Sequence, residues 1–101
     1  MSVIEIPVNL FNHPKIRYLL NLPNGKEYVL MWMRMVCMAA TCDMGGNLTL
    51  SWGASYTTQD LAREFDMDEE TVKEGLMVMQ RLGMAYATRP IAVKGLEVLE
   101  E

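Results

Sequence analysis

Hydrophobic residues are densest over residues 28–40, YVLMWMRMVCMAA, where only Arg34 interrupts a run of apolar and aromatic side chains. A surface helix carries one apolar stripe, whereas a helix that is apolar on nearly every side is surrounded by protein or by lipid. Lipid is disfavoured, because a membrane span needs about 20 apolar residues and tolerates a central arginine poorly. The pattern predicts a central helix, roughly 26–42, which the rest of the chain covers on most sides and which leaves some apolar surface for a second copy.

The segments around this helix alternate between strand and helix patterns. Hydrophobic and polar residues alternate over residues 3–10, which predicts a half-buried edge strand. A helix at about 15–22 follows, with Asn12 as its N-cap and Pro14 in its first turn. Alternation over residues 48–52 predicts a second, short strand.

Two further helices are predicted close together, at about 58–65 and 69–82. Thr57 and Asp60 have the spacing of a capping box at the start of the first helix, and Gly83 is suited to end the second. The apolar spacing predicts an inward face made of Leu61, Ala62 and Phe65 on the first helix and of Val72, Leu76, Met79 and Leu82 on the second. Two short helices joined by three or four residues are typical of a helix-turn-helix.

After the second helix, residues 84–88 and 91–93 can pair as a hairpin, which would form a wing. The predicted fold class is therefore mainly α with a small β-sheet (α+β). More specifically, it is a winged helix-turn-helix with an N-terminal strand–helix extension. We expect one domain over residues 1–101, with the helix-turn-helix at about 57–83 and the wing at about 84–99.

Composition limits the classes of protein to which the chain can belong. It has 101 residues, half of them hydrophobic, and a net charge of −4, so it is a small globular domain with no general attraction to nucleic acid or anionic membrane. No secretory signal is visible at the start. We interpret Cys37 and Cys42 as buried, reduced thiols of a cytosolic protein, and with His13 as the one histidine we expect no metal site and no cofactor.

Several segments together resemble a known family. They are LFNHPKIRYLL (10–20), LPNGKEYVLMWMRMVCMAA (22–40), GGNLTL (45–50), YTTQDLAREF (56–65) and TVKEGLMVMQRLGM (71–84). This order resembles the N-terminal domain of phage replisome organisers, which are DnaD-like replication initiation proteins. The resemblance implies a winged helix that takes part in starting DNA replication through origin DNA, self-association and helicase loading. It also implies a phage or prophage protein in the bacterial host cytoplasm.

Two departures from the family pattern limit what the resemblance carries over. The chain stops near residue 101 without the second domain that such proteins use for further DNA and helicase contacts, and its wing region lacks the expected Asn-Trp ending. We therefore expect a fragment or a reduced relative, and helicase contacts do not follow from the resemblance.

Contact with DNA would come from the second helix of the pair, which such motifs place in the major groove. Residues 57–84 contain three basic and seven acidic residues, so the net negative charge of this region disfavours binding to phosphate. The candidate DNA-binding residues are Thr58, Gln59, Lys73, Gln80, Arg81, Arg89 and Lys94. The alternative interpretation is a solvated helix face, with Lys73 paired to Glu69 and Glu70 and Arg81 pointing into water.

Self-association is the competing function. The chain contains ten methionines, which supply adaptable apolar surface, and a small domain cannot easily bury all of it. The candidate residues are Ile4, Ile6, Met33, Cys37 and Met77. The expected partners are further copies of the chain, duplex DNA and other replication proteins, and no membrane.

An enzyme is not predicted. The acidic run Asp66, Asp68, Glu69 and Glu70 suits a helix N-terminus better than a metal loop, and no nucleotide-binding glycine pattern is present. The sequence therefore favours a phage-type replication initiation module that combines self-association with DNA contact in replisome assembly. A winged-helix transcriptional regulator, or an interaction domain without DNA binding, remains the alternative.

Overall fold

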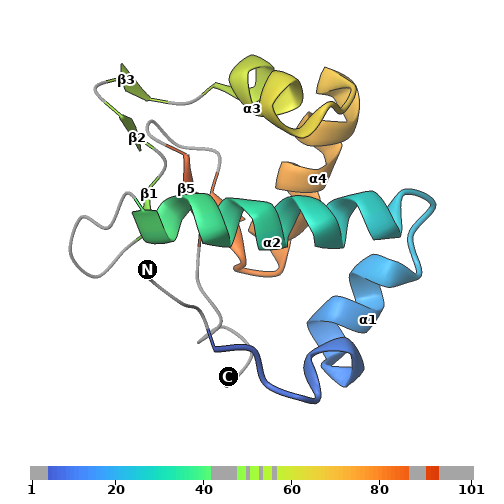
Figure 1. Cartoon of the computed structure of the whole chain (residues 1–101). Coiled ribbons are helices and arrows are strands. Elements are labelled where there is room, and N and C mark those ends of the chain that lie inside the picture. The colour runs from blue at the N-terminus through green and yellow to red at the C-terminus, as the bar shows by residue number, and fades with distance from the viewer. Residues whose placement is uncertain are drawn as a thin grey trace.

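The structure, a computed structural model, describes residues 5–41, 48–49, 51–52, 54–55, 57–86 and 91–93. The helices are η1 (Leu10–Asn12, a 3-10 turn), α1 (Pro14–Leu20), α2 (Gly25–Thr41), α3 (Thr58–Phe65) and α4 (Glu69–Arg81). The strands are β1 (Leu48–Thr49), β2 (Ser51–Trp52), β3 (Ala54–Ser55), β4 (Ala85–Tyr86) and β5 (Ala92–Val93). The fold is therefore mainly helical, as predicted. Figure 1 shows α2 crossing the middle of the molecule, with α1 on one side and α3 and α4 on the other.

Helix α2 is the centre of the hydrophobic core, as the dense apolar run predicts. Its buried side chains are Tyr28, Val29, Met31, Trp32, Met35, Val36 and Ala39. The opposite side of the helix is not covered, since Leu30 is 57% exposed and Cys37 is also exposed. The expectation that both thiols are buried is thus wrong for Cys37, because this residue lies on the outward side of α2. Cys42 lies outside the described residues.

The N-terminal strand prediction is wrong where the structure describes it. Residues 5–9 form no strand, and the chain continues into η1. Local hydrogen bonds replace strand pairing here: the Leu10 N–H donates to the Pro7 carbonyl at 3.1 Å and the Asn12 N–H to the Asn9 carbonyl at 3.0 Å. Leu10 is buried in the core, which anchors this segment.

Helix α1 starts as predicted with Pro14 in its first turn, but its N-cap is His13 rather than Asn12. His13 has an extended backbone, and its Nδ1 accepts a hydrogen bond from the Lys15 N–H at 3.1 Å. The imidazole thus satisfies one of the N–H groups that a helix start leaves without a partner.

The strands form two small sheets. β4 pairs with β5 in an antiparallel ladder, Ala85 opposite Val93 and Tyr86 opposite Ala92, and β1 pairs on the other side of β5. The predicted pairing of residues 84–88 with 91–93 is therefore present over these positions. The predicted strand at 48–52 is instead divided between β1 and β2: among the described residues, β1 pairs with β5 and β2 pairs with β3.

Within the described residues, no helix is both long and apolar enough to span a bilayer. The same part of the chain brings together no group of three or more His, Cys, Asp or Glu residues that could hold a metal ion.

Candidate nucleic-acid interface

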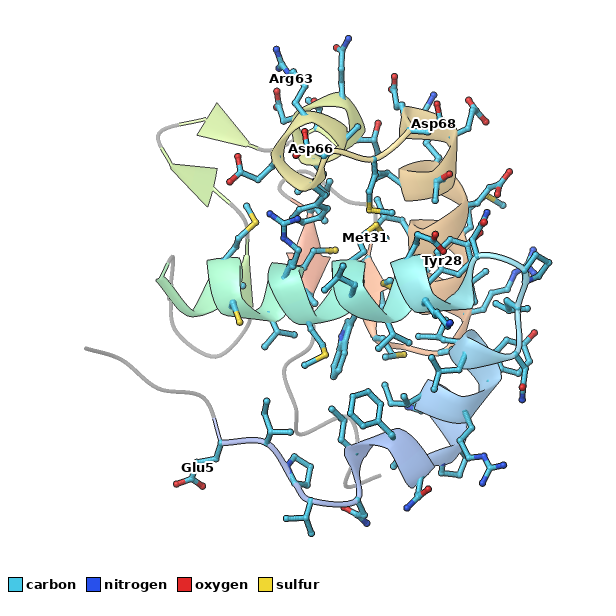
Figure 2. All side chains as sticks on the ribbon, turned by 45° about the vertical axis from the view of Figure 1, so that its right-hand side comes forward. Glu5, Tyr28, Met31, Arg63, Asp66 and Asp68 are labelled. Atoms are coloured by element: carbon cyan, nitrogen blue, oxygen red, sulfur yellow. The ribbon has the colours of Figure 1, made fainter. Side chains whose placement is uncertain are left out.

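Residues 66–68 connect α3 to α4, and a pair of hydrogen bonds fixes the start of α3. Thr57 caps α3: its side chain accepts from the Asp60 N–H at 3.1 Å, while Asp60 Oδ2 accepts from the Thr57 N–H at 3.0 Å. This reciprocal pair is the predicted capping box, with Asp in place of the usual Glu or Gln. Figure 2 shows Asp66 and Asp68 in the connection between the two helices.

Both helices end in the same type of cap. Asp66 follows α3 in the left-handed conformation, with φ 53° and ψ 45°, and the Met67 N–H donates back to the Ala62 carbonyl at 2.9 Å. Gly83 follows α4 with φ 72°, and the Met84 N–H donates to the Met79 carbonyl at 2.8 Å. Such caps satisfy the last carbonyls of a helix and turn the chain sharply.

The inner side of α4 fixes which of its residues face solvent. Val72, Leu76 and Met79 are buried, and Gly75 lies so close to α2 that an added Cβ would be 2.6 Å from Met31 Cε. Leu82 is only partly buried against the core. The exposed residues of α4 are Glu70, Lys73, Glu74, Met77, Gln80 and Arg81, while Glu69 is half-buried.

Four of the seven candidate DNA-binding residues come together on this side. Thr58, Lys73, Gln80 and Arg81 line an open hollow together with Leu76 and Met77. Gln59 is exposed in the first turn of α3 but does not line the hollow. Arg89 and Lys94 lie outside the described residues.

Carboxylates neutralise much of the positive charge at this hollow. Lys73 Nζ lies 3.6 Å from Glu69 Oε1 and 3.9 Å from Glu70 Oε1, so the predicted local pairing of Lys73 is present. The same Glu69 oxygen accepts a hydrogen bond from the Thr58 hydroxyl at 3.3 Å. Arg81 is exposed and has no hydrogen bond or ion pair within the described residues, so its guanidinium is available to a ligand.

The candidate self-association residues that the structure describes are not all brought together. Met33 and Cys37 line a second hollow with Arg34, Met38 and Glu64, between α2 and α3. Met77 belongs to the hollow on α4, where it is 58% exposed, and Ile6 lies in the N-terminal segment. Ile4 lies outside the described residues.

Sequence reasoning missed Leu30 as a candidate for self-association. Leu30 precedes Met33 by three positions and Cys37 by seven, a spacing that places all three on one side of a helix. That spacing could have identified it. The residue was overlooked because a helix this apolar was expected to be covered on most sides.

Arg34, the one charge in the apolar run, connects α2 to the end of α3. Its guanidinium donates to the Glu64 carbonyl at 3.1 Å and to the Phe65 carbonyl at 3.5 Å, and it lies 4.8 Å from the centroid of the Phe65 ring. A cation suits these last carbonyls, which carry the negative end of the helix dipole. The arginine therefore fixes the position of α3 on α2.

A second polar contact connects α2 to α4. The Tyr28 hydroxyl donates to Glu74 Oε2 at 3.3 Å. Burial of the ring is the largest cause of a raised Tyr28 pKa, and the nearby Glu74 carboxylate raises this pKa further. Tyr28 therefore stays protonated and keeps its donor role throughout the neutral range.

These features define a class of protein: a small, mainly helical domain with a solvent-facing helix pair and, within the described residues, no cluster suited to a catalytic metal. The chain belongs to the N-terminal phage replisome organiser family, whose model matches residues 3–94. No curated protein and no solved structure matches it. The resemblance noted in the sequence is thus confirmed, and the role of the chain lies in phage replication initiation.

Proposed function

We propose that the chain is one winged-helix domain that contributes DNA contact to replisome assembly through α4. The helix-turn-helix would cover about 57–83 and the wing about 84–99. The pairing of β4 with β5 directly after α4, and of β5 with β1, supports this assignment. The observation that carries the proposal is the gathering of Thr58, Lys73, Gln80 and Arg81 around one hollow on the exposed side of α4.

The hollow offers groups suited to different parts of a duplex. A threonine hydroxyl and a lysine ammonium suit phosphate oxygens, whereas glutamine and arginine can read base edges. The surrounding acidic residues weaken the attraction for phosphate, so we expect binding that is modest and sensitive to salt.

The test measures binding of the whole chain to duplex DNA over a salt series by fluorescence anisotropy. Arg81→Ala should weaken binding; a slope of log K against log salt reduced by about one would identify Arg81 as a phosphate contact, and an unchanged slope would identify it as a base contact. Arg17→Ala is the matched control, since it removes the same charge from α1, which Figure 1 places on the other side of α2. Absence of binding at low salt, or equal effects of both variants, would contradict the proposal.

Self-association is the second function that we propose, through the exposed side of α2. This side carries Leu30, Met33 and Cys37 as an apolar row, next to Arg34 and Glu64. A two-fold interface must complement itself, and this surface has both signs of charge beside its apolar residues. The Glu64 carboxylate forms no ion pair within the part of the chain that the structure describes. In a dimer, Arg34 of one copy would pair with the Glu64 carboxylate of the other copy.

Light scattering of the purified chain tests this second proposal. Leu30→Glu should shift the molar mass to that of the monomer, because it places a charge at an exposed position of the apolar row. Val8→Glu is the control, since Val8 is fully exposed in the N-terminal segment. If Val8→Glu dissociates the complex and Leu30→Glu does not, the N-terminal segment is the interface instead.

A further inference from the structure

Glu69 holds two of the groups that would contact the DNA backbone. It lies in the first turn of α4, and its Oε1 accepts a hydrogen bond from the Thr58 hydroxyl at 3.3 Å. The same oxygen lies 3.6 Å from Lys73 Nζ. One carboxylate oxygen therefore serves a hydroxyl of α3 and an ammonium of α4 together.

A phosphate group of DNA would need the same two partners. Hydroxyl and ammonium donors are the usual contacts to phosphate oxygens, and both groups here line the hollow on α4. Glu69 Oε1 thus occupies the position next to the Thr58 hydroxyl and Lys73 Nζ that a phosphate oxygen would occupy. A duplex can reach them only by displacing the carboxylate or by tolerating its repulsion.

We infer that Glu69 is a specificity-determining residue, which competes with the DNA backbone for Thr58 and Lys73 and so suppresses binding to arbitrary sequence. The inference rests on the proposed contact of α4 with DNA. Non-specific affinity comes almost entirely from phosphate neutralisation, so a carboxylate that engages Lys73 lowers it directly. The Glu69 carboxylate weakens contacts to base edges less, and Arg81 is available for such contacts. Base contacts therefore contribute a larger share of the binding free energy at a specific site.

Glu70 does not have the same position. Its Oε1 lies 3.9 Å from Lys73 Nζ, its side chain is 74% exposed against 41% for Glu69, and within the described residues it forms no hydrogen bond with Thr58. Glu69 is therefore the residue through which the acidic start of α4 acts on both donors.

The experiment compares the whole chain with Glu69→Gln and Glu5→Gln on a short duplex of mixed sequence, over a salt series. Glu69→Gln should bind about tenfold more tightly at low salt, and the slope of log K against log salt should steepen by about one, because Lys73 becomes available to a phosphate. Glu5→Gln removes the same charge, and Figure 2 shows Glu5 at the opposite end of the molecule from Asp66 and Asp68. It should change affinity little.

A further variant tests the route of the effect. In Lys73→Ala, the additional change Glu69→Gln should give much less than the tenfold gain. If the wild type binds and Glu69→Gln binds no better than Glu5→Gln, the inference is overturned while the proposed DNA contact stands. If neither the wild type nor Glu69→Gln binds at low salt, both the inference and the DNA contact fail.

Discussion

Asp66 adopts a backbone conformation that few side chains tolerate. Its φ of 53° lies in the left-handed region, where a Cβ costs roughly 1 kcal/mol and where aspartate, asparagine and glycine are favoured. The conformation is required because the Met67 N–H must reach back to the Ala62 carbonyl and α4 must start two residues later. The turn between α3 and α4 thus begins with a residue at positive φ.

We expect Asp66→Gly to raise the free energy of unfolding by up to about 1 kcal/mol and Asp66→Ala to lower it by a similar amount. Glycine relieves the strain at positive φ, whereas alanine keeps the Cβ and loses the polar group that aspartate can use locally. Urea denaturation measures both. Asp66→Asn controls for the lost charge, and equal stability of the glycine and alanine variants would show that the conformation is not strained.

The sequence largely predicts which residues are buried, but it does not predict which distant residues they contact. The inward positions Leu61, Ala62 and Phe65 follow from helical spacing, and all three are buried. That Arg34 would contact the end of α3 could not be read from its neighbours, because the contact joins residues about thirty positions apart. Local pattern determines which side of an element is buried, and tertiary packing determines what lies there.

At the scale of elements, the N-terminus of α3 is held by a pair of hydrogen bonds that depends on the charge of Asp60. The pKa of Asp60 is lowered, first because its carboxylate accepts from the Thr57 N–H, then by the Thr57 side chain and by Arg63. A carboxyl whose folded pKa is lower than its unfolded value of 3.8 stabilises the fold above that pH. This contribution is lost as the pH falls through the folded pKa.

Acid should therefore loosen the start of α3. Denaturant titrations at a series of pH values should show the stability of the wild type falling below pH 3.8, with a smaller fall in Asp60→Asn. Asp68→Asn makes the same chemical change at the N-cap of α4, where the side chain forms no capping hydrogen bond. It should keep the wild-type loss in acid, and an equal flattening in both variants would contradict the assignment to Asp60.

Helices were predicted closely, α2 within one residue at each end as well as α3 and α4, whereas the strand expected at 3–10 was not found in its described part. α3 has its capping box and α4 its Gly83, and both lie within a residue of the predicted bounds. The segment 3–10 had only alternation, which an edge strand and an extended chain share. Within the described residues 5–9, turn hydrogen bonds around Pro7 and Asn9 form instead of strand pairing.

At the scale of the whole molecule, two glycines set how closely the helices pack on α2. Gly25 is buried where α1 meets α2, and an added Cβ would overlap the carbonyl oxygens of Leu19 and Leu20. Gly75 faces α2 from α4, where the nearest atoms are the end of the Met31 side chain and the Tyr28 ring. One contact is with backbone and the other with side chains.

Gly25→Ala should lower the free energy of unfolding by about 3 kcal/mol, since backbone atoms of α1 cannot move without shifting the helix. Gly75→Ala should cost less, about 1 to 2 kcal/mol, because the end of the Met31 side chain can move and alanine favours the helix, while the Tyr28 ring, 2.9 Å from the added Cβ, must also shift. Thermal and urea unfolding of the two variants measure the difference. A larger loss in Gly75→Ala would mean that the α2–α4 contact is the more rigid one.

Arg34 belongs to two surfaces at once. It lines the hollow with Met33 and Cys37, and its guanidinium also anchors the last turn of α3. A molecule bound in this hollow would therefore contact the side chain that joins α2 to α3. Arg34 thus joins the surface that we propose for self-association to the helix pair that we propose for DNA contact, so we expect assembly at the first to alter the second.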